Sequence, residues 1–414
     1  MDKVIAPCRL AGRVSVPPSK SFFHRAVICA ALANGVSEVL PYRFSEDIEA
    51  TIQAMRAFGA QIEIKDDTLY IDGTDLKKQQ AVTIDAGESG STLRFLLPIA
   101  SVLANTSGFY GRNRLIQRPI TPFTRILDGQ EIPYLYDGKL PITIQGSLQG
   151  GEIAVSGNIS SQFLTGLLLC LPLFDKPGRV VLTTPLESKP YIDITLDVLR
   201  QFGVMIEHKD YETFVLQSGT YTPQNYIVER DFSQAAFFLV AAALENDITV
   251  CGMNEASVQG DGRIVDILRR VGCKVGFDCG EITITPGKLT AFREDVSDIP
   301  DLVPILALLA VFCEGETVLC NAARLRIKES DRLAATTAEL TKLGARIIEK
   351  PDALHIIGTN ALHGGNCTSH NDHRIVMMLA IAATKASGAV QIENAGAVDK
   401  SYPHFFDDYA SLKR

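Results

Sequence analysis

The segment Leu199-Arg-Gln-Phe-Gly203-Val-Met-Ile-Glu207, followed by Phe214-Val-Leu216, contains the pattern that decides the fold. A helical turn ends at a glycine, and two alternating strand-like runs come after it. Glycine is typical of a helix C-cap, because it adopts left-handed backbone angles without steric strain. The two runs are typical of the arms of a β-hairpin. The segment therefore predicts a helix followed directly by a hairpin.

The same plan recurs at four other places in the chain. The marker glycines at positions 59, 129, 203, 272 and 344 lie 70, 74, 69 and 72 residues apart. Regular spacing of this kind indicates repeated supersecondary units. A sixth helix, Phe405 to Lys413, has no hairpin after it, while Val4 to Ala6 and Arg13 to Val16 resemble a hairpin about Gly12 with no helix before it. We expect the two ends of the chain to complete one another.

Six units predict an α/β protein of two similar lobes, each built from three repeated βαβ-hairpin units. One lobe would comprise residues 19–227, and the other residues 1–18 together with 228–414. The hinge is expected where the chain crosses, near 17–20 and 223–228. A length of 414 residues suits two cores of roughly 200 residues each, since single cores rarely grow larger. The alternative is a coincidental βαβ pattern in an ordinary α/β protein.

The composition is that of a globular protein, with 46% hydrophobic and 21% charged residues. A formal net charge of -8 argues against nucleic acid as a partner, because proteins that bind phosphate backbones usually carry a basic surplus. The nine cysteines include no CxxC pair, which favours reduced thiols. No signal peptide and no membrane-spanning apolar run is evident. We therefore expect a cytoplasmic protein without a membrane partner.

The stretch Pro17-Pro18-Ser19-Lys20-Ser21-Phe22-Phe23-His24-Arg25 places a lysine, hydroxyls and an arginine at one predicted helix start. The prolines favour an extended entry, and Ser19 is expected to cap the helix. Free N–H groups and the positive end of the helix dipole would attract an anion beside Lys20 and Arg25. An ordinary capped helix with solvated charges is the alternative.

Several other turns and helix starts carry glycines, hydroxyls or charges. They are Asp85 to Arg94, Gln117 to Ile120, Gly157 to Phe163, Ser188 to Tyr191, Ser297 to Asp301, Arg324 to Arg332, Asn371 to Arg374 and Asp399 to Pro403. Each alone is explained equally well as an N-cap or a solvated face. Together they indicate a clamp for small polyanions, with Asp301 and Glu329 as the groups that handle protons. His370 and His373 have no third ligand nearby, so no metal is expected.

These motifs resemble, in this order, those of the enolpyruvyl transferase family, and in particular its branch that acts on shikimate 3-phosphate. The resemblance covers the whole chain and implies two lobes of sixfold repeated units, an inside-out α/β barrel. It implies transfer of the enolpyruvyl group of phosphoenolpyruvate to the 5-hydroxyl of shikimate 3-phosphate, through a tetrahedral intermediate and with release of phosphate. This reaction belongs to the shikimate pathway of aromatic amino acid biosynthesis. No cofactor is implied, and the expected partners are the two small substrates of a monomeric enzyme.

The resemblance also implies a role for each motif residue. Shikimate 3-phosphate would be bound by Lys20, Ser21, Arg25, Ser160, Ser161, Gln162, Ser188, Tyr191, Asp301 and Lys328. Phosphoenolpyruvate would be bound by Lys20, Gly90, Arg118, Gln162, Arg332, Arg374 and Lys400. Arginine suits such ligands because its planar fork pairs two oxygens at once. Asp301 would be the base for the ring hydroxyl, while Glu329 and Lys20 would move protons at phosphoenolpyruvate. We expect the surrounding arginines to disfavour the charged form of Lys20.

Two residues depart from the family pattern, in which Asn often stands in place of Glu88 and of Arg324. A carboxylate at position 88 would repel phosphoenolpyruvate unless it turned away or paired with an arginine. The branch of the family that acts on a UDP-sugar is one alternative, but it carries a reactive cysteine shortly before the Arg-Pro pair, and Gly111 to Arg118 contains none. A non-catalytic anion-binding repeat protein is another, and it would have no use for Asp301 and Glu329.

Overall fold

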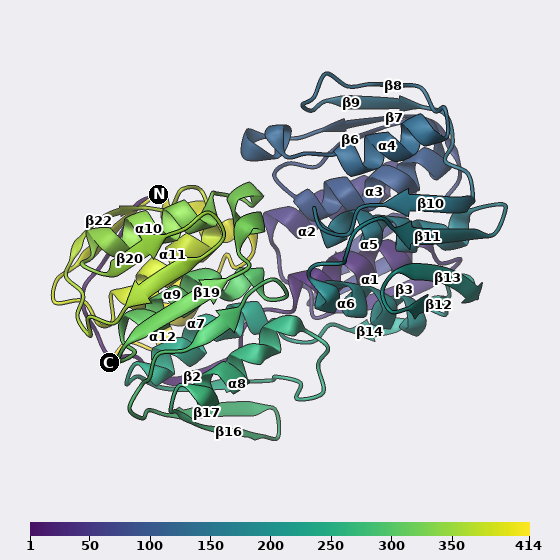
Figure 1. Ribbon diagram of the computed structural model, residues 1–414. Coiled ribbons are helices and arrows are strands. Elements are labelled where there is room, and N and C mark those ends of the chain that lie inside the picture. Colours follow the sequence, from purple (N-terminus) through teal and green to yellow (C-terminus); the bar gives the residue numbers. More distant parts are fainter. The chain divides into compact units, whose positions relative to one another are not determined.

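The computed structural model describes residues 1–414, which form two compact units (Figure 1). Unit 1 comprises Met1–Pro17 and Glu229–Arg414, and unit 2 comprises Pro18–Val228. Each unit has its own buried apolar core. The chain passes from one unit to the other after Pro17 and again after Val228. The hinge expected at these crossings stays a prediction.

Six sheets, three in each unit, repeat one topology. A complete repeat is seen in β6 (Gln79–Asp85), α3 (Gly90–Leu103), β7 (Ala104–Tyr110), α4 (Thr121–Gly129), β8 (Tyr134–Leu135) and β9 (Ile142–Gln145). The first two strands run parallel around the first helix, and the second helix leads into a hairpin whose later arm pairs antiparallel with β7. This is the βαβ-hairpin unit that the marker glycines predict, so the predicted fold class is confirmed.

Two further repeats are continuous in sequence. In unit 2 the second repeat is β10 (Gly151–Val155), α5 (Ser161–Cys170), β11 (Gly178–Leu182), α6 (Lys189–Gln201), β12 (Met205–Lys209) and β13 (Thr213–Ser218). In unit 1 it is β18 (Arg293–Asp295), α9 (Val303–Val311), β19 (Glu316–Cys320), α10 (Arg332–Lys342), β20 (Arg346–Glu349) and β21 (Leu354–Ile357). Both keep the parallel first pair of strands and the antiparallel hairpin.

Two repeats each borrow their first strand from a distant segment. The set α1 (Lys20–Leu32), β3 (Val36–Leu40), α2 (Glu46–Ala57), β4 (Gln61–Lys65) and β5 (Thr68–Asp72) is completed by β14 (Asn225–Ile227), parallel to β3. The set α7 (Phe232–Ala243), β15 (Asp247–Cys251), α8 (Arg263–Arg270), β16 (Lys274–Asp278) and β17 (Glu281–Thr285) is completed by β2 (Ala11–Val14), parallel to β15. Each crossing of the chain therefore directly follows a borrowed first strand, β2 or β14, and leads into the first helix of the other unit.

The sixth repeat is β22 (Gly365–Thr368), α11 (His373–Ala382), β23 (Val390–Glu393) and α12 (Phe405–Ser411), and it is closed by β1 (Lys3–Ile5), antiparallel to β23. The prediction that the chain ends complete one another is therefore confirmed. The prediction of an N-terminal hairpin is wrong, because β1 and β2 belong to different sheets. Gly12 lies inside β2, which pairs with β15 instead of folding back on β1.

Four of the five marker glycines have the left-handed backbone expected of a C-cap, with φ of 106° at Gly59, 86° at Gly203, 115° at Gly272 and 99° at Gly344. Gly129 differs, because it is the last helical residue of α4, and the positive φ falls on Glu131, at 55°. The repeat is therefore conserved in topology, while the residue that reverses the chain differs in one unit.

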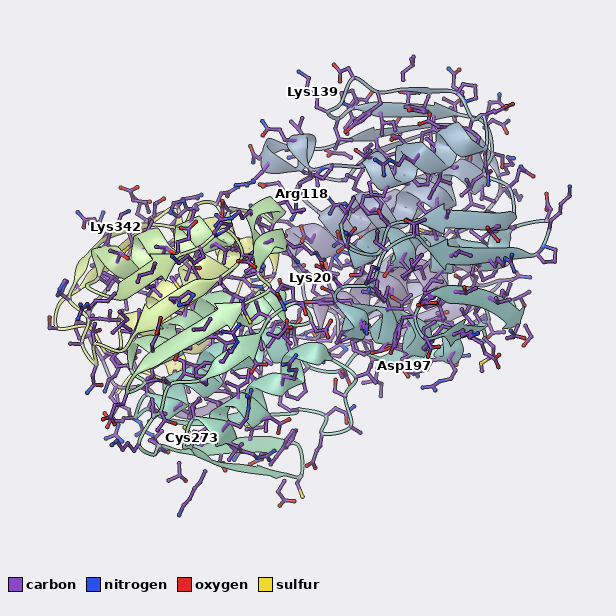
Figure 2. The ribbon with its side chains drawn as sticks, viewed as in Figure 1. Lys20, Arg118, Lys139, Asp197, Cys273 and Lys342 are labelled. Carbon is purple, nitrogen blue, oxygen red and sulfur yellow. The ribbon has the colours of Figure 1, made fainter.

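Each unit separates buried inner helices from amphipathic outer helices. The inner helices are α1, α3 and α5 in unit 2 and α7, α9 and α11 in unit 1. For example, α9 consists of apolar residues alone, and all of them are buried. The outer helices turn charged side chains to solvent, such as Lys342 on α10 (Figure 2) and Arg200 on α6. None of the helices is long and apolar enough to span a membrane.

The inner helices begin at the motifs that the sequence singled out. In unit 2 they start at Lys20, Gly90 and Ser161, and in unit 1 α9 and α11 start after Asp301 and Asp372. In unit 1 the three inner helices α7, α9 and α11 pack against one another. Helix burial thus fixes the positions of the polar residues at each N-terminus.

We expect Gly166→Ala to destabilise the protein. A Cβ atom there would lie 2.4 Å from the carbonyl oxygen of Arg94 and 3.1 Å from the Cα of Phe95, where α5 crosses α3. Backbone atoms yield less readily than side chains, so the free energy of unfolding should fall by about 1 to 3 kcal/mol or more, measured by urea denaturation.

Gly129→Ala is the matched control for this substitution. Gly129 is helical, and nothing lies within 4 Å of a Cβ built on it. Stability should stay equal or rise by up to about 1 kcal/mol. Equal urea midpoints for Gly166→Ala and Gly129→Ala would contradict the tight crossing of α3 and α5.

Candidate active site

The start of α1 joins Lys20 to an acidic partner. Lys20 Nζ lies 2.7 Å from Asp47 Oδ2, at the start of α2. This contact with Asp47 was not predicted, because only arginines were expected around Lys20. Ser19 occupies the N-cap position, but its hydroxyl makes no cap hydrogen bond and is buried without a partner, so that part of the prediction is wrong.

Arg25 is buried and links α1 to α6. Its Nε donates to Thr195 Oγ1 at 2.8 Å, and its Nη2 donates to the carbonyl oxygen of Tyr191 at 3.0 Å. Its Nη1 donates to the carbonyl oxygen of Ser21 at 2.6 Å. The guanidinium also stacks over the Phe95 ring, 4.9 Å from the centroid. Ser21, Arg25 and Tyr191, all predicted to bind the same substrate, therefore lie together.

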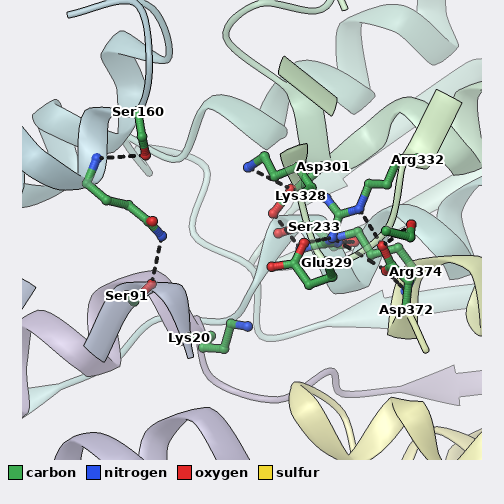
Figure 3. Close-up of polar contacts among 12 residues, drawn as sticks. Lys20, Ser91, Ser160, Ser233, Asp301, Lys328, Glu329, Arg332, Asp372 and Arg374 are labelled. Atoms are coloured by element: carbon green, nitrogen blue, oxygen red, sulfur yellow. Dashed lines mark hydrogen bonds and ion pairs between the residues drawn. The ribbon is translucent and has the colours of Figure 1, made fainter. Parts of the chain in front are cut away.

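The starts of α3 and α5 are tied by a chain of polar contacts. Arg94 Nη1 donates to Gln162 Oε1 at 2.7 Å. Gln162 Nε2 donates to Ser91 Oγ at 3.1 Å, the contact drawn as the dashed line that ends at Ser91 in Figure 3. The guanidinium of Arg118 lies against the backbone of Gly90, because a Cβ built on Gly90 would come within 2.7 Å of Arg118 Nη1. The structure thus brings together Gly90, Arg118 and Gln162, three of the four residues of unit 2 that were assigned to phosphoenolpyruvate.

Three of the serines predicted to bind shikimate 3-phosphate lie at two neighbouring helix starts. Ser160 caps α5, its hydroxyl accepting from Gln162 N at 3.3 Å, and Ser161 is the first residue of that helix. Ser188 precedes α6 with a left-handed backbone, at φ 58°, and is buried. A hydrogen bond from Glu187 N to Gly157 O joins the two loops. A left-handed serine is uncommon, and such conformations gather at functional sites.

In unit 1 the polar cluster is centred on Arg332, whose side chain is only 1% exposed (Figure 3). Its Nη1 donates to Asp301 Oδ1 at 2.6 Å and its Nη2 to Glu329 Oε2 at 2.7 Å. Its Nε donates to Asp372 Oδ2 at 2.8 Å. One guanidinium therefore holds three carboxylates, two of which are the predicted catalytic acids.

Arg374 and Lys328 also surround Asp301. Arg374 Nη2 donates to Asp301 Oδ2 at 2.8 Å, and Lys328 Nζ lies 3.7 Å from Asp301 Oδ1. Burial alone would raise the pKa of Asp301, but the charges of Arg374, Lys328 and Arg332 outweigh it and hold that pKa well below its usual range. Burial lowers the pKa of Lys328 to about 8. Asp301 is therefore a carboxylate at neutral pH, and Lys328 exchanges protons in mildly alkaline solution.

Asp372 caps α11 and completes this cluster, although the sequence analysis gave it no role. Its Oδ1 accepts from Arg374 N at 2.9 Å, and its Oδ2 accepts from Ser330 Oγ at 2.9 Å. Asp372 stood inside a quoted motif, so its position beside Arg374 was the available signal. Asp47 had no such signal, because only the packing of α1 on α2 places it beside Lys20.

The remaining predicted residues take defined positions. Lys400 ends η6 (Ala395–Lys400), is buried, and donates from Nζ to the carbonyl oxygen of Asn371 at 2.7 Å. Arg324 lies in η5 (Ala323–Ile327), just before Lys328. The carboxylate of Glu88 accepts from Asn113 Nδ2 at 2.9 Å, which ties the Gly90 turn to η1 (Asn113–Gln117). The structure contains no group of three His, Cys, Asp or Glu residues suited to hold a metal ion.

Known proteins share this architecture. The model of the family described as EPSP synthase (3-phosphoshikimate 1-carboxyvinyltransferase) matches residues 4–409. The chain belongs to the EPSP synthase family. The 3-phosphoshikimate 1-carboxyvinyltransferase of Clostridium kluyveri is 46% identical over 410 residues, which cover 99% of this chain and 96% of that protein. Its namesake from Clostridium botulinum is 45% identical over 417 residues, with the same two coverages.

Solved structures extend the EPSP synthase comparison to the fold. The EPSP synthase of Acinetobacter baumannii superposes with a TM-score of 0.80 at 26% identity, covering 100% of this chain and 98% of that one. The enolpyruvyl transferase NikO of Streptomyces tendae gives a TM-score of 0.79 at 19% identity over 99% and 96% of the two chains, which shows a shared fold. The resemblance stated from the motifs is confirmed, while the role of each residue stays a prediction.

We expect Gly90→Ala to weaken the binding of phosphoenolpyruvate more than that of shikimate 3-phosphate. The added methyl group would lie 2.7 Å from Arg118 Nη1 and 3.2 Å from Arg94 Nη1, so it must displace the Arg118 guanidinium. The KM for phosphoenolpyruvate should rise about tenfold, in line with roughly 1 to 3 kcal/mol of overpacking, while the KM for shikimate 3-phosphate changes little. Steady-state kinetics with each substrate varied will measure this. Equal changes in the two KM values, or none, would remove Gly90 from the binding site of phosphoenolpyruvate.

Proposed function

We propose that this chain catalyses the reaction of 3-phosphoshikimate 1-carboxyvinyltransferase (EC 2.5.1.19), the transfer of the enolpyruvyl group of phosphoenolpyruvate to the 5-hydroxyl of shikimate 3-phosphate. The reaction is a step of the shikimate pathway, which leads to the aromatic amino acids. The observation that carries the proposal is the pairing of Asp301 and Glu329 with one buried guanidinium, in a member of the EPSP synthase family. We further infer that the protein acts as a monomer in the cytoplasm.

The helix starts of unit 2 would hold shikimate 3-phosphate. Ser160, Ser161 and Ser188 present hydroxyl and N–H donors at the starts of α5 and α6, where the helix dipoles favour a phosphate. Ser21 and Arg25, with Lys20, would bind the carboxylate, while Gln162 and Tyr191 would orient the ring. Lys328 and Asp301 would be the contributions of unit 1. The proposal draws support from the clustering of the unit 2 residues around Arg25 and Gln162.

Cations from both units would bind phosphoenolpyruvate. In unit 2 these are Lys20 and Arg118, with the backbone of Gly90 and the amide of Gln162. In unit 1 they are Arg332, Arg374 and Lys400. The unit 1 cations are already fixed by hydrogen bonds to carboxylates or carbonyl oxygens, so they need little reorganisation when the substrate arrives. Together, the positive charges of these side chains would offset the negative charges of the carboxylate and the phosphate of phosphoenolpyruvate.

The acids carry the proton transfers. Asp301 would accept the proton of the 5-hydroxyl while the oxygen of that hydroxyl attacks C2 of phosphoenolpyruvate. Glu329 with Lys20 would deliver a proton to C3. The tetrahedral intermediate then loses phosphate and one C3 proton, which leaves the enol ether. The proton taken up at C3 is thereby balanced by one released, and Asp301 passes the hydroxyl proton to the departing phosphate or to solvent.

Substrate binding would also adjust the basicity of Asp301. With Arg332 and Arg374 bonded to it, Asp301 is a weak base, because its pKa lies well below the usual range. A substrate carboxylate or phosphate competes for the same two guanidinium groups. Once the substrate anion offsets their charge, these guanidinium groups depress the pKa of Asp301 less, and Asp301 becomes a stronger base. Binding of phosphoenolpyruvate thus prepares the acceptor for the ring hydroxyl.

The function is tested by phosphate release with both substrates present. We expect turnover that requires both phosphoenolpyruvate and shikimate 3-phosphate and that persists in EDTA, since the cations of the site are side chains. A UDP-sugar in place of shikimate 3-phosphate should give no turnover. Activity that is lost on chelation and restored by zinc or magnesium would sink the metal-free mechanism, and turnover with the UDP-sugar would redirect the substrate assignment.

Asp301→Asn and Glu329→Gln should each reduce kcat by about 10² or more, because both keep the side-chain shape and remove the carboxylate. Binding of shikimate 3-phosphate, measured by calorimetry, should survive. Asp352→Asn, an exposed residue in the turn between β20 and β21, is the matched control and should keep wild-type turnover. Near-normal turnover in either test variant would exclude that acid from the mechanism.

The assignment of one substrate to residues of both units predicts a response in solution. If Ser160, Ser161 and Ser188 bind the same molecule as Asp301 and Lys328, then shikimate 3-phosphate should favour a more compact protein. Small-angle scattering should show a smaller radius of gyration on addition of shikimate 3-phosphate, but not of shikimate. An unchanged radius, with binding established by calorimetry, would argue against the hinge expected near 17–20 and 223–228.

A further inference from the structure

Unit 1 contains one more buried carboxyl group near the cluster, that of Asp261, which has no part in the mechanism above. Asp261 lies in η3 (Gly260–Gly262), directly before α8, and is 5% exposed. Its Oδ1 atom is buried without a hydrogen-bond partner. A buried carboxylate oxygen with no donor is strongly disfavoured, so the position requires a physical explanation.

The turn that carries Asp261 is fastened to the start of α7. Gln259 Oε1 accepts from Phe232 N at 3.0 Å, and Gln259 Nε2 donates to the carbonyl oxygen of Arg230 at 2.7 Å. Gly262 N then bonds to the carbonyl oxygen of Gln259 at 3.0 Å, which closes the turn over Asp261. The turn thus holds the carboxyl group inside the unit, where Oδ1 has no partner and the Ser233 side chain hydrogen-bonds to the carboxyl group.

The charged groups that face Asp261 are Asp301, Arg374 and Asp231. Asp231 caps α7 and accepts from Ser233 Oγ at 2.7 Å, and the Ser233 side chain also lies against the Asp261 carboxyl group. Arg374 donates to Asp301 and, at 3.3 Å, to the carbonyl oxygen of Ser233, while its Nε atom is buried without a partner. Three carboxyl groups therefore share the field of one guanidinium that bonds directly to Asp301.

This crowding determines the protonation of Asp261. Burial, together with the negative charge of Asp301, raises the pKa of Asp261 to about 7. The group therefore passes between a neutral acid and a carboxylate near neutral pH. The two forms place different charges near Arg374, which interacts electrostatically with Asp261.

We propose that Asp261 is a positioning residue that controls the availability of Arg374: its neutral form leaves the guanidinium to the anionic substrate, and its carboxylate form draws the guanidinium back into unit 1. The inference rests on the proposed role of Arg374 in binding phosphoenolpyruvate. The unpartnered Nε of Arg374 and the unpartnered Oδ1 of Asp261 are the donor and the acceptor that would meet in the retracted form. The KM for phosphoenolpyruvate should then rise with pH as Asp261 ionises.

The decisive variant is Asp261→Asn, which has the shape of the neutral acid and cannot ionise. Between about pH 6.5 and about 8.5, the KM for phosphoenolpyruvate of the wild type should rise about three- to tenfold relative to that of Asp261→Asn. Titration of Lys328 and of the substrate phosphate affects both enzymes and cancels in this ratio. Asp266→Asn, on α8 with a side chain 70% exposed, removes the same charge from the same region and should keep the wild-type profile.

Two results would contradict the proposal. Superimposable pH profiles for the wild type and Asp261→Asn would overturn it while leaving the proposed function intact. Arg374→Lys tests the premise separately, because an unchanged KM for phosphoenolpyruvate in that variant would overturn both the role of Arg374 and the inference.

A measurement on the wild type keeps the proposal testable should Asp261→Asn fail to fold. Carbon-13 NMR of protein labelled at the aspartate carboxyl carbons should show one buried group that titrates near neutral pH. Because binding and ionisation are linked reciprocally, saturating phosphoenolpyruvate should move that titration to higher pH. The absence of such a group, or a shift to lower pH, would overturn the inference.

Discussion

The polar cluster of unit 1 depends on the burial of one guanidinium, that of Arg332. A charge so deeply enclosed is tolerated only when carboxylates surround it, and Asp301, Glu329 and Asp372 each accept one of its hydrogen bonds. These acids come from three places in the chain: the turn before α9, the start of α10 and the cap of α11. Removing any one of them leaves a buried charge short of a partner. The same hydrogen bonds that hold these elements together therefore fix the orientation of the proposed catalytic acids, Asp301 and Glu329.

One repeated topology supports a different polar cluster in each unit, because its polar residues lie at the N-termini of the inner helices. In unit 2 serines precede these helices, and Ser160 and Ser89 use their hydroxyls as caps. In unit 1 Asp231 and Asp372 are the caps, and their charge calls for arginines nearby. Serine caps leave the positive helix ends available to an anionic ligand, whereas aspartate caps neutralise them. The proposed phosphate binding and the proposed proton transfer thus fall on different units without a change of fold.

The sequence predicted the repeat because a glycine and a hairpin are local features, readable from a few residues each. It predicted the site motifs for the same reason, since each lies within one turn. Contacts between segments distant in sequence were not predictable in this way. Asp47 reaches Lys20 only because α2 packs on α1, and Asp261 faces Arg374 only because Gln259 fastens its turn to α7. The N-terminal hairpin was wrong on similar grounds, since β2 pairs with β15, more than two hundred residues away.

The carboxylates among the binding cations explain how an acidic protein keeps a site for anions. Without substrate, isolated arginines and lysines would repel one another in a confined space, whereas Asp301 and its neighbours hold Arg332, Arg374 and Lys328 close together. A substrate anion replaces part of this carboxylate field with its own charge. The exchange is nearly balanced in charge, so the cations stay in place and the change falls on the acid that loses its partners. In the proposed mechanism Asp301 is that acid, since the arginines that hold its pKa well below the usual range would then also bind the substrate anion.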